Sequence, residues 1–137
     1  MSDITSQTLT SLVKNIKEKK LSSEEVTKAF VDRSEKSKEL NSYITEDFSN
    51  AIDKSKKFDE KPNLDLKLPG IPMAVKDLFC TKDIRTTAGS KILENFVPTY
   101  ESTVTQNIWN EGAILLGKLN CDEFAMGSSN ETSFYGN

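Results

Sequence analysis

All six glycines of this 137-residue chain lie at position 70 or later, and this asymmetry divides the sequence in two. Glycine supplies the backbone conformations that tight turns need, so the turns are expected in the second part. The glycine-free part instead shows helical periodicity and many charges. The sequence therefore predicts an N-terminal helical segment at residues 1–67, followed at residues 68–137 by strands and turns.

Three amphipathic helices are expected in the first segment, over residues 8–19, 22–37 and 47–59. The second should begin at a capping box, in which Ser22 and Glu25 satisfy each other's backbone N–H groups. Its inner edge is expected to be marked by four side chains: Val26, Ala29, Phe30 and Arg33. Residues 41–45 are expected to form only a short extended link.

The second segment reads as strand, helix, strand. A strand is predicted at residues 71–75, a helix beginning at Ser102 or Thr103 and ending near Gly112, and a strand at residues 113–117. The last run is continuously apolar, which is typical of a strand buried on both faces of a parallel sheet. The order indicates a βαβ unit and an α/β fold class.

Composition excludes several kinds of site. The chain has no histidine and only two cysteines, Cys80 and Cys121, so neither a Ser-His-Asp triad nor a Cys/His zinc site can be built from it. Its net charge of −3 gives no electrostatic case for nucleic-acid binding by this segment. No run is long and apolar enough for a membrane span, and no secretory signal is visible. A cytoplasmic location and reduced thiols are expected.

Lys76 stands at the end of the apolar run 71–75, and two interpretations of it stay open. It can extend to water from the end of its strand. Alternatively, burial can lower its pKa enough for the neutral amine to act as a base toward a serine. Asp77 should point to the opposite face of the strand.

Residues 126–133 offer a second candidate site. Gly127, Ser128 and Ser129 form either an ordinary polar turn or a loop whose hydroxyl and N–H groups line a polar pocket. Asp122 and Glu123, just before it, are expected to be first-turn carboxylates of a helix rather than a catalytic pair.

Taken together, six stretches resemble the amidase signature family: LPGIPMAVKD (68–77), CTK (80–82), IRTT (84–87), SKILENF (90–96), GKLN (117–120) and DEFAMGSSNETS (122–133). The stretches at 90–96 and 122–133 favour the tRNA-linked branch of that family. The helices at residues 1–67 fit only in pattern. The resemblance implies the N-terminal part of the amidase signature fold, with helices first and then βαβ elements of a mixed sheet.

The resemblance also implies a Ser–cis-Ser–Lys triad, with Lys76 as the catalytic lysine that deprotonates the middle serine. Met126, Gly127 and Ser128 would line the glutamine pocket. The family's Gly/Ser-rich stretch, which carries the middle serine and the nucleophile, is missing from the 137 residues. Ser128 and Ser129 belong to the preceding motif and do not replace those serines. The chain is therefore expected to be an incomplete domain, cut before the catalytic loop and inactive by itself.

The activity implied for the longer protein is the release of ammonia from glutamine, for the conversion of Glu-tRNA(Gln) to Gln-tRNA(Gln) by a ligase-class complex. The implied partners are glutamine, the misacylated tRNA and two further subunits, B and C, in a heterotrimer. No cofactor or metal is expected on this chain, because ATP and Mg²⁺ would be used mainly at the partner subunit. Two alternatives remain: a free-standing amidase acting on a small amide, and a non-catalytic truncated product.

Overall fold

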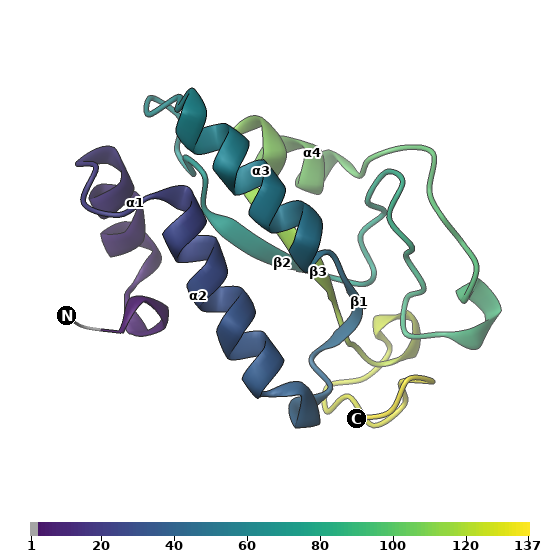
Figure 1. Cartoon of the computed structure of the whole chain (residues 1–137). Coiled ribbons are helices and arrows are strands. Elements are labelled where there is room, and N and C mark those ends of the chain that lie inside the picture. The colour runs from purple at the N-terminus through teal and green to yellow at the C-terminus, as the bar shows by residue number, and fades with distance from the viewer. Residues whose placement is uncertain (1–2) are drawn as a thin grey trace. The chain divides into compact units, whose positions relative to one another are not determined.

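The computed structural model describes residues 3–137, and Figure 1 shows the path of the chain. Four α-helices and three strands lie within these residues. They are α1 (Leu9–Lys17), α2 (Ser23–Lys36), β1 (Tyr43–Glu46), α3 (Phe48–Glu60), β2 (Pro72–Lys76), α4 (Thr103–Asn110) and β3 (Ile114–Leu119). The α/β class is confirmed, and the three predicted N-terminal helices are present within a few residues of their expected bounds.

The chain divides into two compact units, each built from separated segments. The first contains the residues up to Lys36, with Asp47–Met73 and Ile108–Leu116. The second contains Ser37–Glu46, Ala74–Asn107 and Gly117–Asn137. The expected division into residues 1–67 and 68–137 stays a prediction. It marks where the helical segment ends along the sequence, whereas the two compact units are defined by which residues lie close together in space.

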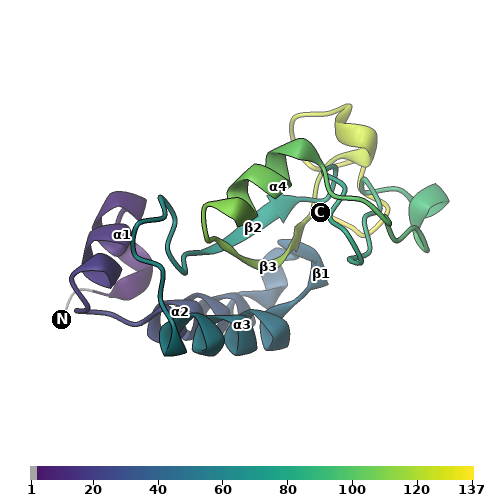
Figure 2. The same ribbon diagram turned by 90° about the horizontal axis from the view of Figure 1, so that it is seen from above.

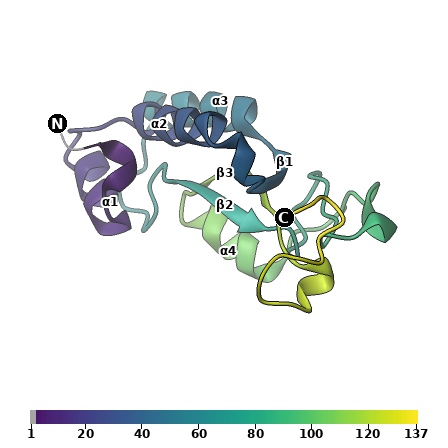
Figure 3. The same ribbon diagram turned by 90° about the horizontal axis from the view of Figure 1, so that it is seen from below.

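The core of the first unit forms where α1 and α2 present their apolar faces to the start of β2. Its buried members are Leu12, Ile16, Val26 and Ile71. Helices α2 and α3 lie side by side, as Figures 2 and 3 show from above and below. The predicted inner edge of α2 is wrong at Arg33, whose side chain is 64% exposed and pairs with Asp3. A guanidinium group carries a large desolvation cost, so at the end of this face it stays in water.

The capping box at the start of α2 is confirmed. The Ser22 N–H donates to Glu25 Oε2 at 2.8 Å, and the Glu25 N–H donates to Ser22 Oγ at 3.0 Å. Asp59, near the end of α3, adds a second cap. Its two carboxylate oxygens accept from the N–H groups of Ser23 and Glu24 at 2.9 and 2.8 Å. The first turn of α2 is therefore satisfied both locally and from a residue far along the chain.

The three strands form one mixed sheet in the order β1-β3-β2. Strands β2 and β3 are parallel, since Ile114 N–H donates to Ile71 O and Asp77 N–H donates to Leu119 O. With α4 between them in sequence, they form the predicted βαβ unit. Strand β3 is buried over Ile114–Lys118, as its apolar run predicts.

The expected link at residues 41–45 proves to be a paired strand. Residues 43–46 form β1, antiparallel to β3, with Tyr43 opposite Leu119 and Glu46 opposite Gly117. The pairing is close at Gly117, where an added Cβ would collide with the carbonyl oxygen of Thr45. A short polar strand has little periodicity of its own, so the sequence predicts its extension but not its partner.

Within residues 3–137, no helix is both long enough and apolar enough to cross a membrane.

Candidate functional site

Lys76 is the last residue of β2, and its side chain is exposed. Pro72 and Met73 begin the strand half-buried and Val75 is buried, so the apolar alternation ends where Lys76 turns outward. The Lys76 amine makes no hydrogen bond or ion pair within the described part of the chain. It is thus placed by its strand alone, with its amine available to another group.

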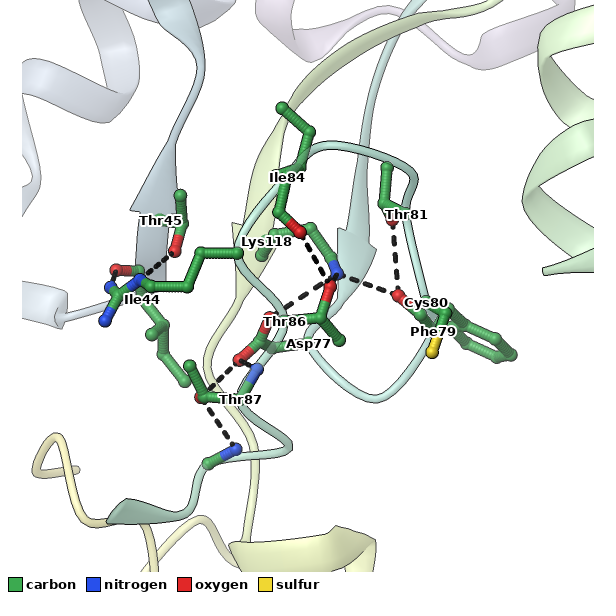
Figure 4. A network of polar contacts seen from close by, with 12 residues as sticks. Ile44, Thr45, Asp77, Phe79, Cys80, Thr81, Ile84, Thr86, Thr87 and Lys118 are labelled. Atoms are coloured by element: carbon green, nitrogen blue, oxygen red, sulfur yellow. Dashed lines mark hydrogen bonds and ion pairs between the residues drawn. The ribbon is translucent and has the colours of Figure 1, made fainter. Parts of the chain in front are cut away.

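Asp77, the next residue, is fully buried. Figure 4 shows its carboxylate within a network of polar contacts. Oδ2 accepts from the Thr87 N–H at 2.9 Å and from the Thr87 hydroxyl at 2.5 Å. Oδ1 lies 3.5 Å from Nζ of Lys118, which is also fully buried. The expectation that Asp77 and Lys76 point to opposite faces agrees with one being buried and the other exposed.

Lys118 is the centre of the network in Figure 4. Besides the ion pair with Asp77, its ammonium donates to the Phe79 carbonyl at 2.8 Å and to the Thr86 hydroxyl at 2.7 Å. Desolvation lowers the pKa of Lys118, and the neighbouring Asp77 carboxylate opposes that shift. Two hydrogen bonds and one ion pair thus compensate for the burial of the ammonium group.

Sequence reasoning missed Lys118 and the two threonines as parts of the site. The only local signal was a lysine directly after a run of buried apolar residues, the same signal that drew attention to Lys76. The sequence could not show that Lys76 is exposed and Lys118 buried. Burial of Lys118 depends on the acceptors that the loop at 79–87 brings to its amine.

The predicted pocket residues lie on the surface loop after β3. Met126 is 80% exposed, and Gly127 and Ser128 are exposed as well. Within residues 3–137, no hydrogen bond or ion pair joins any of these three to Lys76. Gly127 is required where it stands, because a Cβ there would collide with the carboxylate of Asp122.

Asp122 differs from its expected role in the first turn of a helix. Only a single 3-10 turn, Glu123–Ala125, follows it, and Phe124 there has φ 51°. Instead, the chain at 129–132 wraps around its carboxylate, which accepts from the N–H groups of Ser129, Asn130 and Thr132 at 2.9–3.1 Å. The backbone hydrogen bonds from Asn130 and Thr132 are the main reason that the pKa of Asp122 is lowered to about 2.

The cysteines and acidic residues form no metal centre in the part of the chain that the structure describes. Cys80 and Cys121 are free thiols, the first half-buried and the second buried. Burial raises the pKa of the Cys121 thiol, which disfavours the reactive thiolate.

Comparison with known proteins gives consistent matches. The chain is 82% identical over 137 residues to the A subunit of glutamyl-tRNA(Gln) amidotransferase from Pelagibacter ubique (strain HTCC1062), covering 100% of this chain and 28% of that protein. It is 51% identical to the protein of the same name from Hyphomonas neptunium (strain ATCC 15444), over 99% of this chain and 28% of that protein. The chain thus spans about 28% of the length of these curated relatives.

Among solved structures, an amidase family protein from Bacillus anthracis str. Ames matches with a TM-score of 0.75 and 30% identity. That match covers 88% of this chain and 25% of the other. The family model described as Amidase matches residues 25–137, which include Lys76, the buried network and the loop at 126–133. Since this match extends over most of the sequence, the chain belongs to the amidase family.

Proposed function

We propose that the whole protein is the glutamine-hydrolysing subunit of a tRNA-dependent amidotransferase, in which Lys76 is the catalytic base. The observation that carries the proposal is the 82% identity, over all 137 residues, to a relative named as the A subunit of glutamyl-tRNA(Gln) amidotransferase. A relative at that identity keeps most side chains of a site, whereas fold alone would leave the substrate open.

The chemistry assigned to Lys76 needs a neutral amine next to a serine hydroxyl. The amine at the end of β2 is exposed and makes no ion pair within residues 3–137, so it is accessible to a serine hydroxyl from the rest of the protein. It takes the proton of the middle serine, which in turn takes the proton of the nucleophilic serine. The serine oxygen then adds to the glutamine side-chain carbonyl, ammonia leaves with a proton returned by the same relay, and water cleaves the resulting ester to glutamate. Both serines belong to the family's Gly/Ser-rich stretch, outside these 137 residues.

Met126, Gly127 and Ser128 are proposed to line the glutamine pocket. Gly127 and Ser128 lie on a loop whose backbone is fixed around Asp122, so their N–H and C=O groups can be presented in a constant geometry. The complex is proposed to be a heterotrimer with subunits B and C, in which the ammonia passes to a partner subunit that uses ATP and Mg²⁺ for the amidation of Glu-tRNA(Gln).

The proposal is tested by Lys76→Ala in the whole protein assembled with its partners. Loss of the base should reduce glutamine hydrolysis by at least about 100-fold, the low end of the range for general base catalysis. Amidation of Glu-tRNA(Gln) supplied with free ammonium should continue, because that step does not use the serine relay. The measurements are glutamate release and formation of Gln-tRNA(Gln) with each nitrogen donor.

The matched control is Lys67→Met, which removes another strongly exposed lysine, with 82% of its side chain accessible, from an ion pair at the surface. It should keep normal glutamine hydrolysis. Turnover by Lys76→Ala at the rate of the unmodified protein would reject Lys76 as the base. Hydrolysis of small amides without any partner subunit, and no amidation of tRNA, would instead identify a free-standing amidase.

A further inference from the structure

A buried ion pair lies directly beside the proposed base. The side chains of Asp77 and Lys118 are both completely inaccessible, and their charged atoms are 3.5 Å apart. Burying two charges costs so much solvation that a well-packed apolar pair is often equally stable or more stable. The pair is therefore weak evidence for a role in stability, and its position next to Lys76 is the more informative feature.

Asp77 is held at both its backbone and its side chain. Its N–H donates to the Leu119 carbonyl at 2.9 Å, and its own carbonyl accepts from the Ala88 N–H at 2.9 Å. One carboxylate oxygen accepts twice from Thr87. The residue that follows Lys76 is thus joined by hydrogen bonds both to β3 and to the loop at 86–88.

Lys118 completes this arrangement from the neighbouring strand. Its ammonium donates to Phe79 and to Thr86, so it ties together the beginning and the end of the loop that follows β2. Oδ1 of Asp77 has no hydrogen bond within the described residues, and it forms the ion pair with Lys118. Removing Lys118 alone would leave that oxygen buried without a partner.

We infer that Asp77 and Lys118 are positioning residues for Lys76, and that they fix the end of β2 from which the catalytic amine projects. The inference rests on the proposed function. The Lys76 amine makes no hydrogen bond or ion pair of its own in residues 3–137, so the backbone at 76–77 determines where it stands. Directional contacts suit this task better than apolar packing, since they define both the position and the orientation of the strand end.

The decisive test is the double variant Asp77→Asn with Lys118→Met in the whole protein with its partners. The double change removes both buried charges and keeps an amide oxygen that can accept from Thr87. The melting temperature should lie above that of Lys118→Met alone, because no unpaired buried charge remains, while kcat for glutamine falls about 10-fold or more and KM stays unchanged. Lys118→Met alone should lower both the melting temperature and kcat.

Two variants at Thr87 test the contribution of a single hydroxyl group to the network. Thr87→Val removes the 2.5 Å hydrogen bond to Asp77, whereas Thr87→Ser keeps it. If the network positions Lys76, kcat should fall several-fold in Thr87→Val and be retained in Thr87→Ser. A purely structural role predicts that kcat follows the melting temperature in both variants instead.

The inference is overturned if the double variant regains both stability and kcat, or if kcat follows stability across all the variants. If the double variant does not fold, Thr87→Val and Thr87→Ser decide instead, and the inference is overturned if their kcat follows their melting temperature. Failure of the proposed function has a different signature, namely absence of glutamine hydrolysis in the unmodified complex or normal hydrolysis by Lys76→Ala. Lys67→Met, at an exposed lysine–carboxylate pair, controls for the loss of a lysine charge.

Discussion

At the scale of the residue, the Asp122 carboxylate holds the loop after β3 in its conformation by accepting hydrogen bonds from the loop's own N–H groups. Its pKa of about 2 lies below the ordinary value of 3.8, so the folded state binds its proton less readily than the unfolded state does. The stabilisation is therefore fully present above pH 3.8 and is lost as the pH falls toward 2. Asp122→Asn should lower the free energy of unfolding at about pH 5, and by clearly less near pH 2.

Urea unfolding of both proteins at these two pH values measures the difference, and a carboxyl titration by NMR gives the pKa directly. Asp53→Asn is the matched control, because that carboxylate is exposed and pairs only weakly with Lys56 at 3.9 Å. An equal loss of stability from Asp122→Asn at both pH values would contradict the assignment of the hydrogen-bonded carboxylate as its source.

At the scale of the element, α2 depends on a cap supplied by α3. The N–H groups of Ser23 and Glu24 both donate to Asp59, although Asp59 lies more than thirty residues further along the chain. Losing a side-chain cap at a helix N-terminus typically costs about 1 kcal/mol. Asp59→Ala is therefore expected to destabilise the protein by about 1–2 kcal/mol and to increase amide exchange most at the first turn of α2.

Equilibrium unfolding and hydrogen exchange at Ser23 and Glu24 provide the measurements. Asp53→Ala, a change on the exposed side of the same helix α3, should alter stability by less than about 0.5 kcal/mol. If exchange at the two amides stays slow in Asp59→Ala, the capping box of Ser22 and Glu25 is sufficient and the cap from α3 is redundant.

At the scale of the whole molecule, these 137 residues contain the proposed base, Lys76, and the proposed pocket loop, whereas the proposed nucleophilic serine is not among them. The family's two serines lie in a stretch that the 137 residues do not contain. A polypeptide of these residues alone is therefore expected to release no glutamate or ammonia from glutamine above background, as a coupled glutamate assay would measure. Hydrolysis by it, abolished by Lys76→Ala, would mean that a serine within these residues serves as nucleophile, against the present assignment.

Local sequence patterns were sufficient to predict the helices, the capping box and the family. The apolar spacing predicted α1, α2 and α3, since a helix satisfies its hydrogen bonds within one segment and needs only one face buried. The capping box followed from two residues three positions apart. The motif around Lys76 led to the family, and the position of Lys76 at the end of a strand could be predicted from the apolar run before it.

Only the tertiary structure decided which polar groups meet. Three contacts show this: the pairing of β1 with β3, the cap that Asp59 gives to α2, and the wrapping of residues 129–132 around Asp122. In each, the sequence of one segment does not indicate which other segment it will contact. The two lysines at strand ends show this most clearly, because Lys76 is exposed and Lys118 is buried. A buried ammonium requires several acceptors at once, and their convergence is a property of the folded chain rather than of any stretch of sequence.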